Sequence, residues 1–179
     1  CLSLICGALA CIFSFHYTEQ IGCLLGYEWA MLCIGVGAIF DFCDGAAARL
    51  LDAYSPLGKE LDSLSDLISF GLAPALLLYN TIEHFSSCSF MPYLAIAIAV
   101  GGALRLAKFN IDERQTTSFI GLATPPNAIF WASLVCWLNS IALPTWTPWV
   151  LLVGSLLSCY LLVSEIPFFS FKSAGQEKK

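Results

Sequence analysis

Residues 41–66 read DFCDGAAARLLDAYSPLGKELDSLSD and carry two pairs of aspartates in apolar surroundings. Asp41 and Asp44 are three residues apart, and Asp62 and Asp66 are four apart. Side chains at these spacings lie on one face of a helix. Because the connection between the pairs is short and contains Pro56, the stretch predicts a helical hairpin. The two acidic pairs are then expected to face each other at about the same depth.

The chain of 179 residues is unusually apolar, with 58% hydrophobic and only 12% charged residues. Soluble domains contain about 45–50% apolar and about 25% charged residues. A chain of this length cannot bury so much apolar surface in one soluble core. The composition therefore predicts an all-α integral membrane protein.

Apolar segments separated by short polar breaks predict six transmembrane helices. The segments are Cys1–Phe15, Glu28–Tyr54, Gly58–Asn80, Phe90–Asn110, Pro126–Asn139 and Pro148–Phe169. With no repeat, low-complexity tract or linker, residues 1–179 are expected to form a single domain. The first segment is shorter than the roughly 20 residues that a bilayer requires, so we expect the first helix to be truncated at its N-terminus.

The basic residues predict how these helices are oriented. Lys and Arg fall at alternate ends of successive segments, and the opposite connections, residues 16–27, 81–89 and 140–147, carry none. The basic residues are Arg49, Lys59, Arg105, Lys108, Arg114, Lys172, Lys178 and Lys179. Because cytoplasmic loops concentrate Lys and Arg, both termini are expected to be cytoplasmic. The aspartates then lie near the cytoplasmic face of a cell membrane.

Four neighbouring carboxylates repel one another, and a charge at a helix centre in the membrane costs about 2.5–3.5 kcal/mol. Divalent cations would neutralise them, and oxygen-only ligands favour Mg²⁺ or Mn²⁺ over zinc. Two such ions bridged by carboxylates are a known device for displacement at phosphorus. The alternative is that the aspartates lie at the interface, hydrated or paired with Arg49 and Lys59.

The residues around the two pairs form one long pattern. It reads Asp41-x-x-Asp44-Gly45-x-x-Ala48-Arg49, eight residues, Gly58, three residues, Asp62, three residues, Asp66. Gly45 and Ala48 remove bulk from the helix so that a ligand can lie close to it, and Arg49 can bind phosphate oxygens with a fixed fork. Gly58 permits a tight entry into the next helix. Helix packing alone would explain the small residues but not the acids and the arginine.

This pattern is the signature of the CDP-alcohol phosphotransferases, and the chain resembles that family at all eight fixed positions. The resemblance implies a homodimeric membrane enzyme that binds two divalent cations. The implied metal ligands are Asp41, Asp44, Asp62 and Asp66, and Asp66 is also the implied catalytic base. The CDP part of the lipid donor would be held by Asp44, Gly45, Ala48, Arg49 and Gly58.

Further segments are similar to the serine-using branch of the family, the phosphatidylserine synthases. They are residues 62–75, 102–110, 119–122 and 166–172. One departure is Ala123, where the family more often has proline after Gly-Leu. The resemblance implies that the phosphatidyl group of CDP-diacylglycerol is transferred to the hydroxyl of L-serine and that CMP leaves.

A cluster of basic residues agrees with an acceptor that carries a carboxylate. Arg105, Lys108 and Arg114 gather at the end of the fourth apolar segment. Arg105 lies deeper in the segment and is the better candidate for binding serine, with Lys108 second. The concentration of positive charge in cytoplasmic loops explains Lys108 and Arg114 equally well.

Other functions stay open at this point. The acceptor could be that of the archaeal-lipid equivalent, glycerol 3-phosphate, inositol or choline, although choline has little use for basic residues. An ion-coupled transporter is an alternative because intramembrane carboxylates often mark ion pathways, but it predicts acids near the midplane, and no inverted repeat is visible. A structural scaffold would leave the acids unexplained. We expect no nucleic-acid partner.

Overall fold

The computed structural model describes residues 2–51, 55–86, 88–111, 121–141 and 144–164. In these ranges the chain is helical, except for one short hairpin and the connections. The elements are α1 (Leu2–Phe15), β1 (Gln20–Ile21), β2 (Leu24–Leu25), α2 (Gly26–Leu50), α3 (Pro56–Asp66), η1 (Leu67–Leu72), α4 (Ala73–Phe85), η2 (Met91–Ile96), α5 (Ala97–Ile111), α6 (Thr124–Asn139) and α7 (Thr147–Val163).

Several of these elements join end to end into longer rods. α3, η1 and α4 form one continuous helical rod, and η2 continues into α5. The described residues therefore form six rods, and each overlaps one of the six apolar segments. The hairpin of β1 and β2 was not expected from the sequence, and it lies in the connection between α1 and α2.

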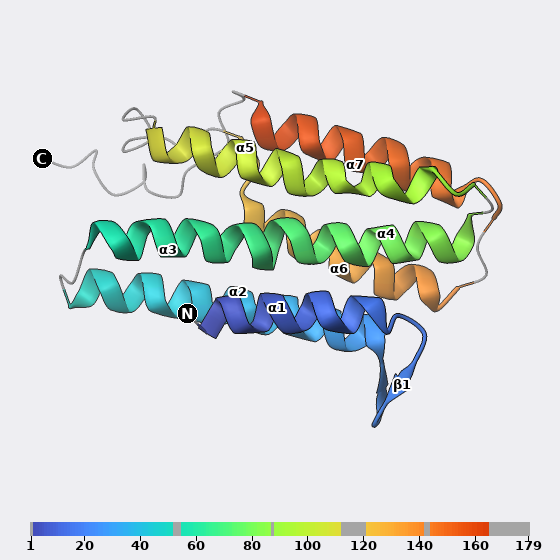
Figure 1. Ribbon diagram of the computed structural model, residues 1–179, viewed down its shortest axis with the longest axis horizontal. Coiled ribbons are helices and arrows are strands. Elements are labelled where there is room, and N and C mark those ends of the chain that lie inside the picture. Colours follow the sequence, from blue (N-terminus) through green and yellow to red (C-terminus); the bar gives the residue numbers. More distant parts are fainter. Residues whose placement is uncertain (1, 52–54, 87, 112–120, 142–143, 165–179) are drawn as a thin grey trace, which may run out of the picture.

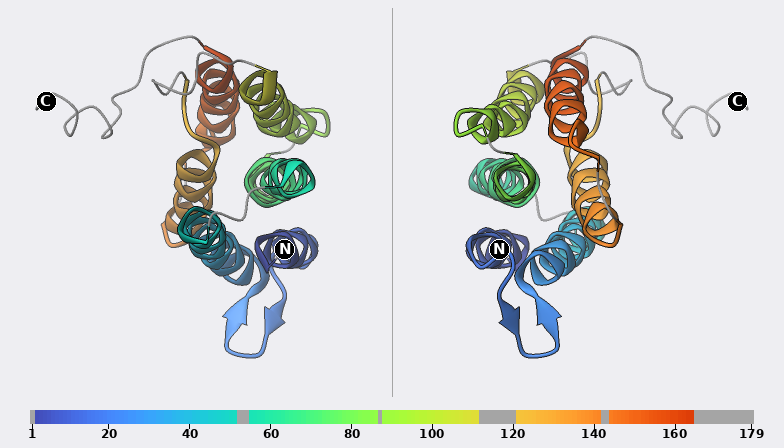
Figure 2. Two further views of the ribbon diagram at one scale, coloured as in Figure 1. Left: turned by 90° about the vertical axis from the view of Figure 1, so that its left-hand side faces the viewer. Right: turned by 90° about the vertical axis from the view of Figure 1, so that its right-hand side faces the viewer.

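The rods lie side by side with their long axes roughly aligned (Figure 1). Viewed along those axes, α1 lies beside α2, and α5 beside α7, with the α3–α4 rod between these two pairs on one side and α6 on the other (Figure 2). α4 packs against α1, α2, α5, α6 and α7. Its side chains Leu77, Leu78 and Ile82 are fully buried. The core of the bundle therefore surrounds α4.

The outer surface of the bundle is apolar. Large exposed hydrophobic side chains include Val36, Ile39 and Phe42 of α2, Val100 and Leu104 of α5, and Val153, Leu157 and Tyr160 of α7. A soluble monomer rarely exposes contiguous apolar surface on this scale, whereas a bilayer solvates it. Within the described ranges, residues 26–48, 57–85 and 91–111 are long and apolar enough to cross a membrane. Two shorter apolar helices are Leu2–Phe15 and Thr147–Val163.

Small residues allow the helices to approach closely. A Cβ atom built on Gly7 of α1 would lie 2.6 Å from the Cα atom of Ser69 in η1. A Cβ on Gly101 of α5 would lie 3.1 Å from the Cα atom of Cys159 in α7. Contacts of this kind bring backbones together in membrane bundles, where the hydrophobic effect does not drive one helix onto another.

η1 is a single stretch of π-helix directly after Asp66. The backbone N–H of Ala73 donates to the carbonyl of Ile68, five residues back. Pro74 follows, and in a regular α-helix its ring would clash with the carbonyl four residues earlier. The wider π turn accommodates this proline without breaking the rod. Such turns are rare and frequently lie at functional sites.

The two ends of the bundle differ in character. The hairpin and the end of α4 lie at one end, and the end of α2, the start of α3 and the end of α5 lie at the other (Figure 1). At the hairpin end, the hydroxyl of Tyr17 donates to Oγ1 of Thr81 at 3.1 Å and accepts from Nδ2 of Asn139 at 2.6 Å. These bonds connect the segment after α1 to α4 and α6.

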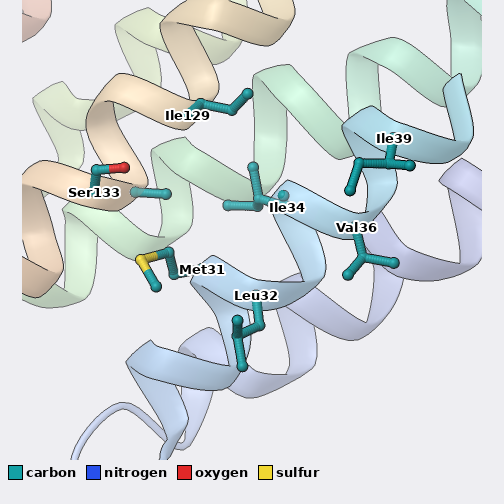
Figure 3. Close-up of a pocket in the computed structure, with 9 residues that line it drawn as sticks. Met31, Leu32, Ile34, Val36, Ile39, Ile129 and Ser133 are labelled. Carbon is teal, nitrogen blue, oxygen red and sulfur yellow. The ribbon is translucent and has the colours of Figure 1, made fainter. Parts of the chain in front are cut away.

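An apolar groove of about 340 Å³ lies between α2 and α6 (Figure 3). It is lined by Met31, Leu32, Ile34, Gly35, Val36, Ile39, Ile129, Ala132 and Ser133. Only one of these side chains is polar, so the groove does not suit a charged nucleotide.

Candidate active site

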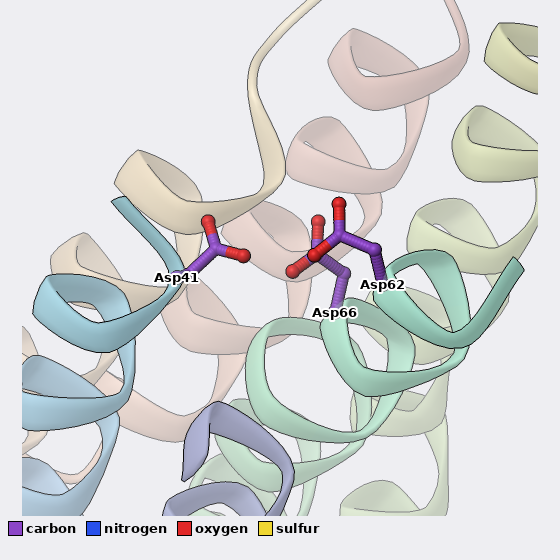
Figure 4. A group of neighbouring side chains, drawn as sticks. All are labelled: Asp41, Asp62 and Asp66. Carbon is purple, nitrogen blue, oxygen red and sulfur yellow. The ribbon is translucent and has the colours of Figure 1, made fainter. Parts of the chain in front are cut away.

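Three of the predicted aspartates meet at the end of the bundle where α2 ends and α3 begins. Asp41 comes from α2, and Asp62 and Asp66 come from α3. Each offers a carboxylate oxygen, and these three oxygens lie within 4.8 Å of one another. Figure 4 shows the three carboxylates facing the space between the two helices. Asp44 is exposed near the end of α2 and does not belong to this group of three.

Ser55 caps the start of α3. Its Oγ accepts a hydrogen bond of 3.0 Å from the N–H of Gly58. A Cβ atom on Gly58 would lie 2.9 Å from that same Oγ atom, and a small shift of the serine side chain would relieve this contact. The cap fixes where α3 begins and how Asp62 and Asp66 are directed.

One carboxylate oxygen of this group is buried without a hydrogen-bond partner among the described residues. It is Oδ1 of Asp66, a half-buried residue. The side chains of Asp41 and Asp66 are within hydrogen-bonding reach of each other. Two carboxylates approach this closely only when they share a proton or a cation lies between them.

This set of ligands fits a hard divalent cation. All three residues offer carboxylate oxygens, and Oδ1 of Asp66 has no hydrogen-bond partner among the described residues. Mg²⁺ and Mn²⁺ prefer such ligands, whereas zinc favours nitrogen and sulfur. The residues present are therefore suited to hold a divalent metal ion.

Arg105 of α5 is a basic residue that interacts with the acidic group. It is half-buried and has an electrostatic interaction with Asp66. Its Nη1 donates to Oγ1 of Thr124, the first residue of α6, which is fully buried. Its Nε is buried and has no hydrogen-bond partner within the described part of the chain. Arg105 thus connects the acidic group with the start of α6.

Lys108 lies one turn further along α5 and has a different environment. It is exposed, and its Nζ donates to the carbonyl of Val163 at 3.3 Å, at the end of α7. Of the two residues predicted to bind serine, Arg105 has an electrostatic interaction with Asp66, and Lys108 contacts the end of α7.

The residues predicted to hold the nucleotide follow Asp41 on α2. Gly45 and Ala48 are half-buried and lie one and two turns beyond Asp41. The side chain of Arg49 and the whole of Arg114 fall outside the described part of the structure.

Thr124 contacts Arg105, and Asn127 follows it by three residues on α6; neither was predicted from the sequence. Both are buried polar residues in the first turn of α6. The only signal was a polar residue at the start of an otherwise apolar segment, and such residues are often functional in membranes. Nearby, Nδ2 of Asn110 donates to Oγ of Ser63 at 3.0 Å and joins α5 to α3 beside the acidic group.

Comparison with known proteins agrees with this geometry. Residues 2–161 match the CDP-alcohol phosphatidyltransferase family, and the chain belongs to that family. A relative from Bacillus subtilis (strain 168), named CDP-diacylglycerol–serine O-phosphatidyltransferase, is 37% identical over 177 residues, which cover 97% of this chain and 88% of the relative.

Relatives with the same name occur in other lineages. The protein from Methanocaldococcus jannaschii is 37% identical over 135 residues, which cover 75% of this chain and 61% of its own length. The protein from Mycobacterium leprae is 34% identical over 146 residues, covering 77% of this chain and 48% of that protein. The chain thus spans about half the length of this mycobacterial relative.

Family membership decides between the classes that the sequence left open. The chain is a membrane-bound transferase of phospholipid biosynthesis, so the transporter and the scaffold are excluded.

Proposed function

We propose that the enzyme transfers the phosphatidyl group of CDP-diacylglycerol to the hydroxyl of L-serine, which yields phosphatidylserine and CMP. The names of the relatives support the two substrates. The observation that carries the proposal is the position of Arg105, a half-buried cation beside Asp66, where an acceptor with a carboxylate could bind.

The four aspartates of the signature would hold the metal. Asp41, Asp62 and Asp66 supply the grouped oxygens, and Asp44 lies one turn beyond Asp41. A bound Mg²⁺ or Mn²⁺, and two ions where the site takes a pair, would neutralise charge on the phosphates and on the departing CMP.

Asp66 acts as the base in this proposal. Its unpartnered Oδ1 can accept the proton of the serine hydroxyl. The serine oxygen then forms a bond to the phosphorus that carries diacylglycerol, and the bond from this phosphorus to the oxygen of CMP breaks. CMP leaves with the electron pair of that bond, and the proton stays on Asp66 until it passes to solvent.

The donor and acceptor would approach the aspartates from different helices. Asp44, Gly45, Ala48 and Arg49 of α2, with Gly58 of α3, would hold the CDP part of the donor, because the small residues leave room beside the helices. Arg105 would bind the serine carboxylate from α5, with Lys108 nearer the rim.

The same proposal includes the arrangement in the membrane. Residues 1–179 form one domain with six spans, both termini on the cytoplasmic side of the cell membrane, and the site opens to the cytoplasm. The absence of Lys and Arg from the connections at the hairpin end supports this orientation. The working unit is a homodimer, as the resemblance to the family implies.

A panel of acceptors tests the proposed function. Purified protein would be incubated with CDP-diacylglycerol, Mg²⁺ or Mn²⁺, and labelled serine, glycerol 3-phosphate, inositol or choline. Label from serine should enter the lipid fraction. Efficient incorporation of glycerol 3-phosphate or inositol, with none of serine, would refute serine transfer. Membership of the CDP-alcohol phosphatidyltransferase family would still stand.

A further inference from the structure

The first turn of α6 presents a side-chain amide where the backbone offers few donors. Pro125 and Pro126 have no backbone N–H, and the N–H of Asn127 donates to the carbonyl of Ala123. The side chain of Asn127 is only 3% exposed. Its Oδ1 accepts a hydrogen bond from Oγ of Ser158 on α7.

A short chain of hydrogen bonds fixes the direction in which this amide points. Nε1 of Trp131 donates to Oγ of Ser158 at 3.1 Å. An indole can only donate, so Ser158 uses its own hydroxyl proton toward another acceptor, and Oδ1 of Asn127 is that acceptor. The NH₂ group of Asn127 must then point away from Ser158. Its Nδ2 is buried and has no hydrogen-bond partner within the described ranges.

The unpartnered amide and the unpartnered guanidinium nitrogen of Arg105 are both connected to the first turn of α6. Arg105 bonds Thr124 through Nη1, and Thr124 precedes Asn127 by three residues on α6. Residues three apart on a helix have Cβ atoms about 5–6 Å apart. Nε of Arg105 and Nδ2 of Asn127 are therefore two buried donors beside the same turn of α6.

The described chain has two other buried side-chain atoms without partners, Oδ1 of Asp66 and Oγ of Ser65. Ser65 precedes Ser69 by one turn, and Ser69 donates to the carbonyl of Ser3, so Ser65 belongs to the side of the rod that faces α1. Asp66 instead interacts with Arg105. The site thus combines two unpartnered hydrogen-bond donors, from Arg105 and Asn127, with one unpartnered acceptor, from Asp66.

We propose that Asn127 is a specificity residue whose amide, together with Nε of Arg105, binds the carboxylate of the acceptor amino acid. Two buried N–H donors beside one turn of α6 suit the two oxygens of a carboxylate, and Asp66 would accept the proton of the same molecule's hydroxyl. The inference rests on the proposed function and adds to it a residue on α6. Ser158 positions the amide without touching the substrate.

Steady-state kinetics of purified variants test this role. Asn127→Ala removes the donor. Asn127→Asp keeps the oxygen that accepts from Ser158 but replaces the NH₂ group with a negatively charged oxygen. Ser155→Ala is the matched control, because Ser155 is a buried serine of α7 whose Oγ donates within its own helix, to the carbonyl of Leu152. Serine and CDP-diacylglycerol would each be varied at saturating levels of the other.

The two Asn127 variants should raise the KM for serine about 10- to 100-fold, with Asn127→Asp affected at least as strongly, since a hydrogen bond to a charged group has this weight. The KM for CDP-diacylglycerol should stay within about twofold, and Ser155→Ala should match the wild type. Serinol lacks the carboxylate, so the kcat/KM for serinol should differ little between the wild type and the Asn127 variants. Ser158→Ala should raise the KM for serine by a smaller factor.

If the Asn127 variants lowered the kcat/KM for serine and for serinol by the same factor, the proposed role of Asn127 would be wrong. A raised KM for CDP-diacylglycerol alone would also contradict it. Because Asn127→Asp retains the bond from Ser158, it remains informative where Asn127→Ala does not fold. A wild-type enzyme that does not use serine would refute the proposed function. An active wild-type enzyme with unchanged Asn127 variants would refute only this inference.

Discussion

Nη1 of Arg105 donates a hydrogen bond to Oγ1 of Thr124, and this bond joins α5 to the first turn of α6 beside the acidic group. Thr124 is fully buried, so the bond is shielded from solvent. The guanidinium is therefore held on one side by α6 while it faces Asp66 on the other.

Thr124→Val should leave Arg105 present but poorly oriented. Valine has nearly the same shape as threonine and cannot accept the hydrogen bond, so the KM for serine should rise about 10-fold or more. Thr124→Ser should restore most of the affinity because it keeps the hydroxyl. Kinetics of the two variants against the wild type measure this, and a Thr124→Ser enzyme as impaired as Thr124→Val would show that packing matters instead.

Arg105→Ala should lower the kcat/KM for serine about 10- to 100-fold, because it removes a charge-assisted hydrogen bond to the carboxylate. Binding of CDP-diacylglycerol should change much less. Serinol should be a poor acceptor for the wild-type enzyme and should lose little further in the variant. If the kcat/KM for serine and for serinol fell by the same factor, Arg105 would contribute to donor binding or to stability of the fold, and not to recognition of the carboxylate.

Asp66→Asn should abolish turnover while CDP-diacylglycerol still binds. The amide keeps the shape of the carboxylate but cannot take up the hydroxyl proton, and a general base contributes a factor of about 10² to 10⁴ to the rate.

Asp44→Ala should instead weaken the binding of the donor and of the metal together. Donor binding and single-turnover rates of both variants separate these effects. Near-normal turnover in Asp66→Asn would assign the proton transfer to another group.

Removal of divalent metal should inactivate the enzyme and lower its melting temperature, since the grouped carboxylates then repel one another. Mg²⁺ or Mn²⁺ should restore both properties. Asp62→Asn should bind the ion more weakly and should be less sensitive to metal removal in its melting temperature, because one of the repelling charges is gone. Thermal unfolding in detergent, with and without chelator, measures this. A melting temperature unaffected by metal would argue against an ion at these residues.

Gly7→Ala should destabilise the bundle by about 1–3 kcal/mol, because the added methyl group overlaps η1 at Ser69. Gly35→Ala on α2 is the matched control, since a Cβ at this position meets nothing within 4 Å. Alanine is favoured over glycine in a helix, so this second change should be neutral or stabilising by up to about 1 kcal/mol. Unfolding of both variants in the same detergent provides the comparison, and equal effects would contradict the close packing of α1 on η1.

The positions of the helices could be predicted because apolar runs in a membrane protein have few alternatives to helices. The rod from Pro56 to Phe85 is longer than predicted, since the polar residues after Asn80 continue α4. The hairpin of β1 and β2 and the π turn at Leu67–Leu72 were not predicted. Both depend on local backbone geometry that periodicity does not report.

The sequence predicted the part of the site that helical spacing determines. Asp62 and Asp66 lie on one face of α3, and a short connection leads back to α2. These two features were sufficient to predict that both residues lie close to Asp41. Thr124 and Asn127 could not be found in this way, because their partners Arg105 and Ser158 lie 19 and 31 residues away in the chain. Contacts between distant helices require the structure.

The measurement that tests the central claim most directly is the stoichiometry of products from CDP-diacylglycerol and labelled serine with purified enzyme and Mg²⁺ or Mn²⁺. The account predicts that labelled phosphatidylserine and CMP appear in equal amounts and that neither forms with Asp66→Asn. Release of CMP without label in the lipid, or incorporation of another alcohol in place of serine, would contradict it.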